Sequence, residues 1–342
     1  MRCADADVRC VACAHRCIIH EGSAGACGVR HNSGGALHGP FGYVAARHIR
    51  PVEVNTVYHV HPGTKALSFG MLGCDLHCGY CQNARLSQNW RKSVEVEELS
   101  PEALVDQAVA AGCSTLCAAY NEPMMAAEWA YQVFAVAKRR GLTTAMVSDG
   151  HTTKQALAYL RPVMDVYRID LKGYSEAQYR QLGGRLAPVL DGLAEALSQG
   201  YWVEVVTLVV PGFNDNLAGL RSLARELVAL NRDIPWHLNG FLPRHRMQHL
   251  APTTPTLPTM LAGSGYAQGL RYVYVGNFGK AVPHLSDTRC AECHSTLIRR
   301  EDYQVVSNDL VDGACGSCGT RLPGLWDAPS TAASAPMHQQ SA

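Results

Sequence analysis

Three closely spaced cysteines, Cys74, Cys78 and Cys81, constrain the structure of this 342-residue chain more than any other feature. They follow a short apolar run at 66–72 that is typical of a buried strand, so we expect them on a loop at the carboxyl end of that strand. Spacings of three and two residues would let one short loop donate thiolates to three irons of a [4Fe–4S] cluster, leaving the fourth iron without a cysteine. A zinc site that includes His77 and cysteines buried as small apolar side chains are the alternatives.

The sequence after this motif alternates between predicted strands and predicted helices. Ser100-Pro101-Glu102 has the residues of a helix start, and leucines between 217 and 230 form a helical face behind an Asn214-Asp215 cap. Further apolar runs lie at 114–120, 142–147, 163–169, 201–210 and 271–275. This alternation predicts an α/β fold with parallel strands buried on both faces. About six such units between 66 and 280 predict a full or partial TIM-type barrel, whose active site would lie at the carboxyl ends of the strands. A doubly wound open sheet is the alternative.

Most of the other cysteines form two groups near the ends of the chain. Fourteen cysteines in an intracellular chain argue for metal sites rather than disulfides. The C-terminal group has two CxxC pairs, the pattern of a zinc ribbon, with a redox-active or iron site as the rival. The N-terminal group is irregularly spaced and suits zinc or a second iron–sulfur cluster. The two groups are Cys290, Cys293, Cys315 and Cys318, and Cys10, Cys13, Cys17 and Cys27.

These patterns divide the chain into four segments. We expect a Cys-rich module at 1–45, the α/β barrel at 60–285, a zinc-ribbon-like module at 286–326 and a disordered tail at 327–342. A formal net charge of +1 without a long basic run argues against binding to nucleic acid. The sequence has no apolar stretch of the roughly 18 residues that a membrane helix needs. Its first residues lack the apolar core of a signal peptide, so a cytoplasmic protein is expected.

Polar side chains are predicted at the carboxyl ends of two strands. Asn121 and Glu122 follow the run at 114–120, and an amide with a carboxylate can bind an ammonium group through charge-assisted hydrogen bonds. A helix-capping turn is the alternative for this pair. Asp170 and Lys172 follow the run at 163–169 and point to one face because strand side chains alternate. A surface ion pair is the alternative there.

The chain resembles the radical S-adenosylmethionine (SAM) superfamily, whose hallmark is C-x3-C-x2-C after the first barrel strand. Within that superfamily it is similar to the radical SAM member of the AmmeMemoRadiSam system, whose core is similar to that of pyruvate formate-lyase activating enzymes. The resemblance covers nearly the whole chain. The motifs that carry it are CVACAHRC…GACGVR at 10–30, YHVHPGT at 58–64, GCDLHCGYCQN at 73–83, YNEP at 120–123, DLKG at 170–173, VEVVTLVVPGFND at 203–215, PWHLNGFLPRH at 235–245 and YVYVGN at 272–277.

The resemblance implies an activase-like oxidoreductase that cleaves SAM reductively at the [4Fe–4S] cluster. Tyr80 would lie beside the adenine, Ser148 begins a turn like the family's Thr-Asn-Gly, and His245 matches a histidine that contacts SAM. The implied SAM contacts are Tyr80, Asn121, Glu122, Ser148, Asp170, Lys172, Asn214 and His245. The segment at 51–56 lacks the basic pair that the subgroup usually carries. Val147 stands where activating enzymes have an aspartate for a cation, so no cation is predicted.

The similarity to glycyl-radical activases makes a protein or peptide the expected substrate. It also implies an external electron donor, and it makes Memo-like and AMMECR-like proteins candidate partners. A small-molecule substrate is the first alternative. A metal-binding or electron-transfer scaffold without SAM chemistry is the second, although a scaffold would not need the Asn-Glu and Asp-Leu-Lys segments.

Overall fold

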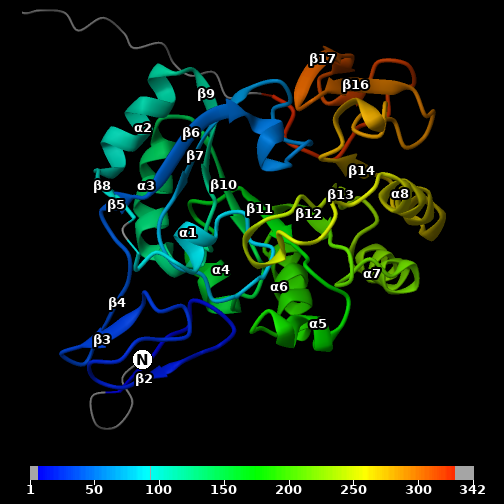
Figure 1. Cartoon of the computed structure of the whole chain (residues 1–342). Coiled ribbons are helices and arrows are strands. Elements are labelled where there is room, and N and C mark those ends of the chain that lie inside the picture. Colours follow the sequence, from blue (N-terminus) through cyan, green and yellow to red (C-terminus); the bar gives the residue numbers. More distant parts are fainter. Residues whose placement is uncertain (1–6, 93, 328–342) are drawn as a thin grey trace, which may run out of the picture.

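The computed structural model describes residues 7–92 and 94–327 (Figure 1). Cys3 and positions 328–342 of the predicted tail lie outside these residues. One eight-stranded sheet forms the centre of the molecule. Its strands in chain order are β6 (Ala46–Pro51), β7 (Lys65–Gly70), β9 (Cys113–Ala118), β10 (Thr143–Ser148), β11 (Val166–Asp170), β12 (Trp202–Val209), β13 (Trp236–Gly240) and β14 (Val273–Gly276).

The strand order shows that the sheet is an open, partial barrel. From β7 to β14 each strand pairs in parallel with the next one along the chain, and β6 pairs antiparallel with β7 at the edge. A doubly wound sheet would reverse its order at a switch point, and this one does not. The predicted α/β class and partial TIM-type barrel are therefore confirmed.

The parallel strands number seven, one more than predicted. The additional strand, β13, was missed because its inward positions are polar: His237 and Asn239 alternate with the buried Trp236 and Leu238. β6 was missed for a similar reason, since it is an edge strand whose residues are largely polar and are half-exposed or exposed. In both cases the apolar run that marks a buried strand is absent.

Helices cover the outer face of the sheet (Figure 1). They are α2 (Pro101–Ala110), α3 (Ala127–Arg139), α4 (Lys154–Leu160), α6 (Leu186–Ser198), α7 (Leu217–Leu230) and α8 (Thr256–Gln268), with the short α1 (Ala84–Ser87) and α5 (Glu176–Gln181) in connecting loops. The predicted start of α2 is confirmed, because the Ser100 side chain accepts a hydrogen bond from the Ala103 N–H at 3.1 Å. The cap of α7 is Asn216, not Asn214-Asp215 as predicted.

The N-terminal residues form small hairpins that pack beside the carboxyl ends of the barrel strands. They include β1 (Val8–Arg9) with β2 (Ile18–Ile19) and β3 (His31–Ser33) with β4 (Ala36–His38), and the short β5 (Tyr43–Val44) pairs with β8 (Glu97–Glu98). The Ala14 N–H donates to the His151 carbonyl at 3.0 Å, and Arg185 donates to the Ala14 carbonyl at 2.9 Å. The N-terminal module is thereby fixed to the loop after β10.

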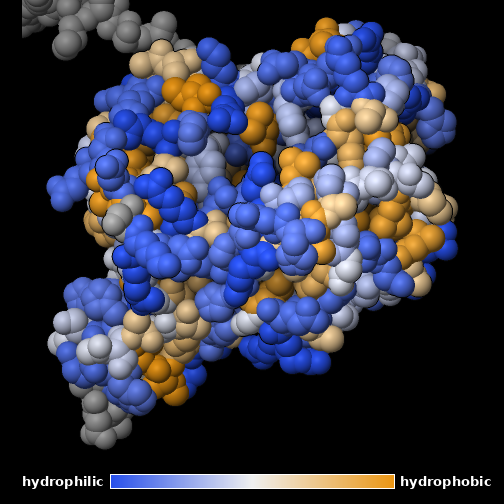
Figure 2. Space-filling view, in the orientation of Figure 1, coloured by the Kyte–Doolittle hydropathy of each residue, from blue (hydrophilic) through white to orange (hydrophobic). Residues whose placement is uncertain are grey.

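The C-terminal residues form a second module beside the open edge of the barrel. It contains a sheet of β15 (Thr288–Arg289), β16 (Thr296–Glu301) and β17 (Gln304–Asn308), followed by the pair β18 (Leu310–Val311) and β19 (Ala314–Cys315). Arg300 joins it to the barrel: its fully buried guanidinium donates to the Tyr58 carbonyl at 2.8 Å and lies 3.7 Å from a Glu53 carboxylate oxygen. Figure 2 shows mainly hydrophilic residues around the centre of this face, with hydrophobic residues in scattered patches.

A buried carboxylate on β12 ties the strands to the segment that leads into β7. Glu204 is fully buried and accepts hydrogen bonds from the Tyr58 and His59 N–H groups, from the Trp202 indole and from His237. Burial opposes its ionisation, but the His237 hydrogen bond and the other donors hold the Glu204 pKa at about 2, below the usual 4.5. This carboxylate satisfies four donors that would otherwise be buried without a partner.

We expect Glu204→Gln to lower the free energy of unfolding by about 3 kcal/mol, because an amide cannot accept from all of these donors. A carboxylate whose pKa is lower in the folded state than in the unfolded state stabilises the fold fully above its unfolded-state pKa. That stabilisation is lost as the pH falls through the folded-state pKa. The wild type should therefore lose stability between pH 4.5 and about 2 in a way that the variant does not. Urea unfolding across this range measures both effects. Exposed Glu226→Gln is the control, and equal stability of the two variants would contradict the role given to Glu204.

Candidate functional site

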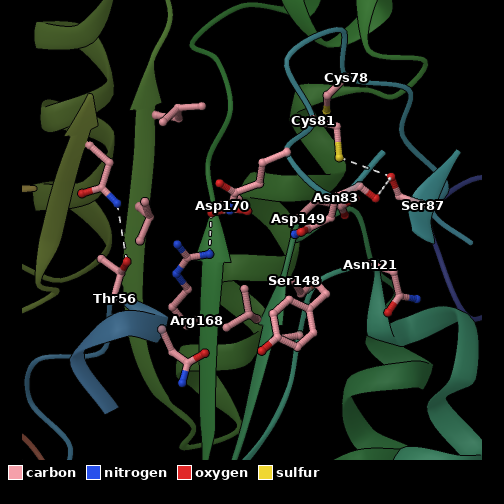
Figure 3. Close-up of a pocket in the computed structure, with 18 of the residues that line it drawn as sticks. Thr56, Cys78, Cys81, Asn83, Ser87, Asn121, Ser148, Asp149, Arg168 and Asp170 are labelled. Atoms are coloured by element: carbon pink, nitrogen blue, oxygen red, sulfur yellow. Dashed lines mark hydrogen bonds and ion pairs between the residues drawn. The ribbon is translucent and has the colours of Figure 1, made fainter. Parts of the chain in front are cut away.

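A cavity of about 590 Å³ lies at the carboxyl ends of the parallel strands (Figure 3). The loops after β7, β9, β10, β11, β13 and β14 all contribute to its lining, as do β6 and the C-terminal module. Among the predicted site residues, those that line it are Cys74, Cys78, Tyr80, Cys81, Asn121, Glu122, Ser148, Asp170 and Lys172. Residues far apart in the sequence are thus brought together where a barrel carries its active site.

The three-cysteine loop begins at a glycine that no other residue could replace without strain. Gly73 has a φ of +90°, and a Cβ there would lie 2.4 Å from a methyl carbon of Val29 in the N-terminal module. The loop then presents Cys74, Cys78 and Cys81 to the cavity. Burial raises the pKa of Cys78 to about 12, so its thiol stays protonated unless a bound cation draws off the proton.

Among the described residues, the lining contains three thiols and no fourth cysteine. This set fits a cluster with one iron left open better than it fits structural zinc, which takes four protein ligands. Tyr80, between two of the cysteines, is buried, and its hydroxyl has no hydrogen-bond partner within 7–92 and 94–327. A ligand in the cavity could supply that missing partner.

Glu122 is held rigidly at the end of β9. One carboxylate oxygen accepts from the Met124 N–H and the Ser148 hydroxyl, each at 3.0 Å, and the other accepts from the Asp149 N–H at 2.7 Å. Burial, together with the nearby carboxylate of Asp149, raises the Glu122 pKa well above its usual value. Asn121 is fixed beside it, with its side-chain oxygen accepting from the Met71 N–H at 3.0 Å. Buried carboxyl groups with raised pKa values indicate a place for a positively charged ligand.

Asp170, at the end of β11, is shared by two cations. Its oxygens lie 2.5 Å from an Arg168 nitrogen and 3.1 Å from the Lys172 ammonium. Although burial opposes its ionisation, the charges of Arg168 and Lys172 lower the Asp170 pKa. Two cations around one carboxylate leave a net positive charge, which suits an anionic group of a ligand.

The structure does not bring Asn214 and His245 to the cavity lining. Asn214 is fully buried, and its side chain binds backbone groups, donating to the Lys172 carbonyl at 2.9 Å and accepting from the Val210 N–H at 2.7 Å. It therefore positions the loop of Lys172. His245 starts a short 3₁₀ turn and is partly exposed, whereas Leu242 and Arg244 of the same segment line the cavity.

Several lining residues were missed in the sequence. Asp149, whose carboxylate lies 3.8 Å from the Cys74 thiol, adjoins the predicted Ser148. Arg168 precedes Asp170 by two residues, so strand alternation could have placed it on the same face. Arg50 on β6 and Tyr303 in the C-terminal module carry no such signal, because their positions depend on long-range packing.

The four C-terminal cysteines converge as predicted for a metal site. Their sulfur atoms lie within 4.8 Å of one another. Cys290 lies 3.6 Å from Cys318, and Cys293 lies 3.6 Å from Cys315. Four thiolates around Zn²⁺ at ~2.3 Å would be ~3.8 Å apart. The Ser295 hydroxyl lowers the pKa of Cys293 to about 6, which favours the thiolate that a metal needs.

The N-terminal cysteines do not form such a group in the described part of the chain. Metal binding there stays a prediction. A different set of ligand-type residues lies where this module meets the cluster loop: His15, Asp75 and His151, with a distance of 2.8 Å from His151 to the Asp75 carboxylate. Asp75 and His151 are fully buried, so this contact fixes the loop that carries Cys74.

No helix within 7–92 and 94–327 has the length and apolar character needed to cross a bilayer.

The chain is similar to proteins of one superfamily. Residues 70–251 match the sequence profile of the radical SAM superfamily. An uncharacterised protein of Methanocaldococcus jannaschii is 32% identical over 324 residues, covering 93% of this chain and 96% of that one. The isethionate sulfite-lyase activating enzyme of Nitratidesulfovibrio vulgaris is 29% identical over 139 residues, which are 39% of this chain and 45% of the enzyme. A solved domain of the pyruvate-formate lyase-activating enzyme of Bacteroides vulgatus aligns at 16% identity and a TM-score of 0.41, covering 48% of this chain and 98% of the domain.

Proposed function

The chain belongs to the radical SAM superfamily, and from this membership we propose that its cavity binds a [4Fe–4S] cluster and SAM for radical chemistry. The reduced cluster would supply one electron that breaks the bond between the sulfonium sulfur and the 5′ carbon of SAM, giving methionine and a 5′-deoxyadenosyl radical that abstracts a hydrogen atom from the substrate. One observation carries the proposal. Three thiols of a single loop line the same cavity as an acidic side chain, Glu122, and a basic one, Lys172.

Each end of the SAM amino acid has a suitable partner in the cavity. Cys74, Cys78 and Cys81 would hold the cluster. Glu122, oriented by Ser148, would accept hydrogen bonds from the SAM ammonium group. Lys172 would pair with the SAM carboxylate, because Arg168 also pairs with Asp170 and can balance its charge. Tyr80 would donate its free hydroxyl to SAM, and its ring would lie against the adenine.

We propose a protein or peptide as the substrate, with an external electron donor. The similarity to an activating enzyme over part of the chain supports an activase-like oxidoreductase. A small-molecule substrate is the alternative. Memo-like and AMMECR-like partners and a cytoplasmic location remain part of the proposal on the strength of the sequence resemblance.

Anaerobic reconstitution with iron and sulfide, followed by SAM and a reductant, tests the proposal. Chromatography with mass detection should show 5′-deoxyadenosine and methionine in equal amounts, because one SAM yields one of each. An intact cluster spectrum without 5′-deoxyadenosine would refute SAM cleavage and favour a scaffold.

We further propose that the four C-terminal cysteines bind structural zinc. We expect Cys315→Ser to remove about one zinc per chain and to lower the melting temperature by at least about 5 °C, because binding energy at such a site is folding energy. Metal analysis and thermal unfolding measure the two effects. Cys117→Ser, which changes another buried cysteine, should retain the zinc. Unchanged zinc in the Cys315 variant would contradict this assignment.

A further inference from the structure

The cavity has two chemically different ends. Figure 3 shows Cys78 and Cys81 at one end and Thr56 and Arg168 at the other, with Asp170 between them. Among the residues that the structure describes, the acidic ones in the lining are Glu122, Asp149 and Asp170. The described side chains at the remote end include amides, hydroxyls and cations. Asp170, which pairs with Arg168, is the carboxylate nearest to them.

Arg168 is the central charge of the remote end. Its side chain is only 8% exposed, and one of its terminal nitrogens binds Asp170 at 2.5 Å. Its Nε atom is buried and has no hydrogen-bond partner in the described part of the chain. A buried guanidinium with an unused donor, lining a cavity, has capacity for a further acceptor.

Four neutral polar side chains share the cavity lining with this guanidinium. Asn55 accepts from the Ser68 hydroxyl at 2.9 Å, and Asn239 donates to the Thr56 hydroxyl at 3.4 Å. All four side chains line the cavity with Arg168. They could donate to or accept from a ligand, and none of them carries a charge.

Two further residues lie where this end opens to solvent. Arg50 on β6 lines the cavity and is exposed, and its side chain makes no hydrogen bond or ion pair with the described residues. Tyr303 reaches the cavity from the turn between β16 and β17, where its hydroxyl donates to Asn277. The C-terminal module therefore forms one wall of the entrance.

We propose that the remote end is a subsite for an anionic group of the substrate, a carboxylate or a phosphate, bound by Arg168 and Arg50 beside Tyr303. This inference rests on the proposed function, because the subsite would hold the molecule from which hydrogen is abstracted. Guanidinium groups bind both anions through paired hydrogen bonds. An anchor at this end would keep the substrate's reacting carbon between it and the cofactors.

Nuclear relaxation in the presence of the paramagnetic reduced cluster tests the subsite with defined probes. The full chain is reconstituted, reduced photochemically so that no dithionite competes, and measured with and without S-adenosylhomocysteine, which fills the cofactor end without being cleaved. Inorganic phosphate is followed by ³¹P relaxation in one arm, and carboxyl-labelled acetate by ¹³C relaxation in the other. We expect faster relaxation than with the oxidised cluster, and the arm that shows it distinguishes phosphate from carboxylate.

The arginine variants assign the effect to the remote end. Arg168→Gln should weaken the anion's binding about tenfold, as expected for the loss of a charge-assisted hydrogen bond. Because Arg168 also contacts Asp170, exposed Arg50→Gln is a second variant that should fold normally and give a smaller reduction. Arg299→Gln, on the C-terminal module outside the lining, should match the wild type.

Three results would overturn the subsite: no relaxation effect in either arm, an effect that both arginine variants retain, or an effect that S-adenosylhomocysteine abolishes. The last result would assign the anion to the position of the SAM carboxylate. A wild type that forms 5′-deoxyadenosine but shows no anion effect would refute the subsite alone. An anion effect with no 5′-deoxyadenosine formation would refute SAM cleavage and leave the anion site.

Discussion

Cys78→Ala should abolish the formation of 5′-deoxyadenosine by the reconstituted protein. The variant keeps only two of the three thiols that line the cavity, so one iron of a cluster would lose its protein ligand. Cys78 is also buried, which leaves little room for water to replace its sulfur. We expect a rate at least about 10³-fold lower, equivalent to more than ~4 kcal/mol. The product is measured by mass spectrometry, and the cluster by its visible absorbance and iron content.

Cys113→Ala is the matched control. Cys113 is a fully buried cysteine at the start of β9 and is not part of the cavity lining, so its loss should affect stability more than activity. Retained cleavage in the Cys78 variant with a full complement of iron would show that Cys78 is not a ligand. Equal loss in the two variants would indicate that folding, not ligation, limits activity.

The fold was predictable because most of its strands are buried on both faces. β7, β9, β10, β11 and β12 each overlap a predicted apolar run, and such runs separated by helices lead to parallel strands in chain order. β13 was not predictable from hydropathy because its inward side chains, His237 and Asn239, serve a polar interior. The same polar interior holds Glu204. In the sequence this residue only interrupts an apolar run, although in the structure it is a buried carboxylate that accepts several hydrogen bonds.

The site was predictable where it adjoins the end of a strand. Asp170 is the last residue of β11 and Glu122 lies four residues after β9, and parallel strands bring such residues to one end of the sheet. Asn214 and His245 lie in longer loops, where local packing decides the direction of a side chain. Asn214 is fully used by backbone groups, and His245 is partly exposed on its short turn. Tyr303 could not have been found, because only the packing of the C-terminal module against the barrel brings it to the cavity.

Glu122→Gln should weaken SAM binding by about 10- to 100-fold while leaving the cluster intact. Glutamine keeps the size of the side chain and one oxygen that can accept from the Met124 N–H or the Ser148 hydroxyl. It loses the negative charge that would face the SAM ammonium group. Burial raises the Glu122 pKa well above its usual value, so the carboxylate is favoured only when a cation lies beside it. Under the proposed function SAM would supply that cation, and the free energy of SAM binding should therefore depend strongly on this residue.

The measurement is the concentration of SAM that gives half-maximal formation of 5′-deoxyadenosine, alongside the iron content and visible spectrum of each protein. Glu128→Gln is the control, because Glu128 pairs with Arg30 at 2.6 Å and does not line the cavity. An unchanged half-maximal SAM concentration in the Glu122 variant would remove this carboxylate from the SAM site. A lost cluster would instead assign Glu122 to the support of the three-cysteine loop, since its carboxylate accepts from the Asp149 N–H at 2.7 Å and the Asp149 carboxylate lies 3.8 Å from the Cys74 thiol. The two outcomes separate a direct contact with SAM from a role in holding the loop, and only the first agrees with the proposed function.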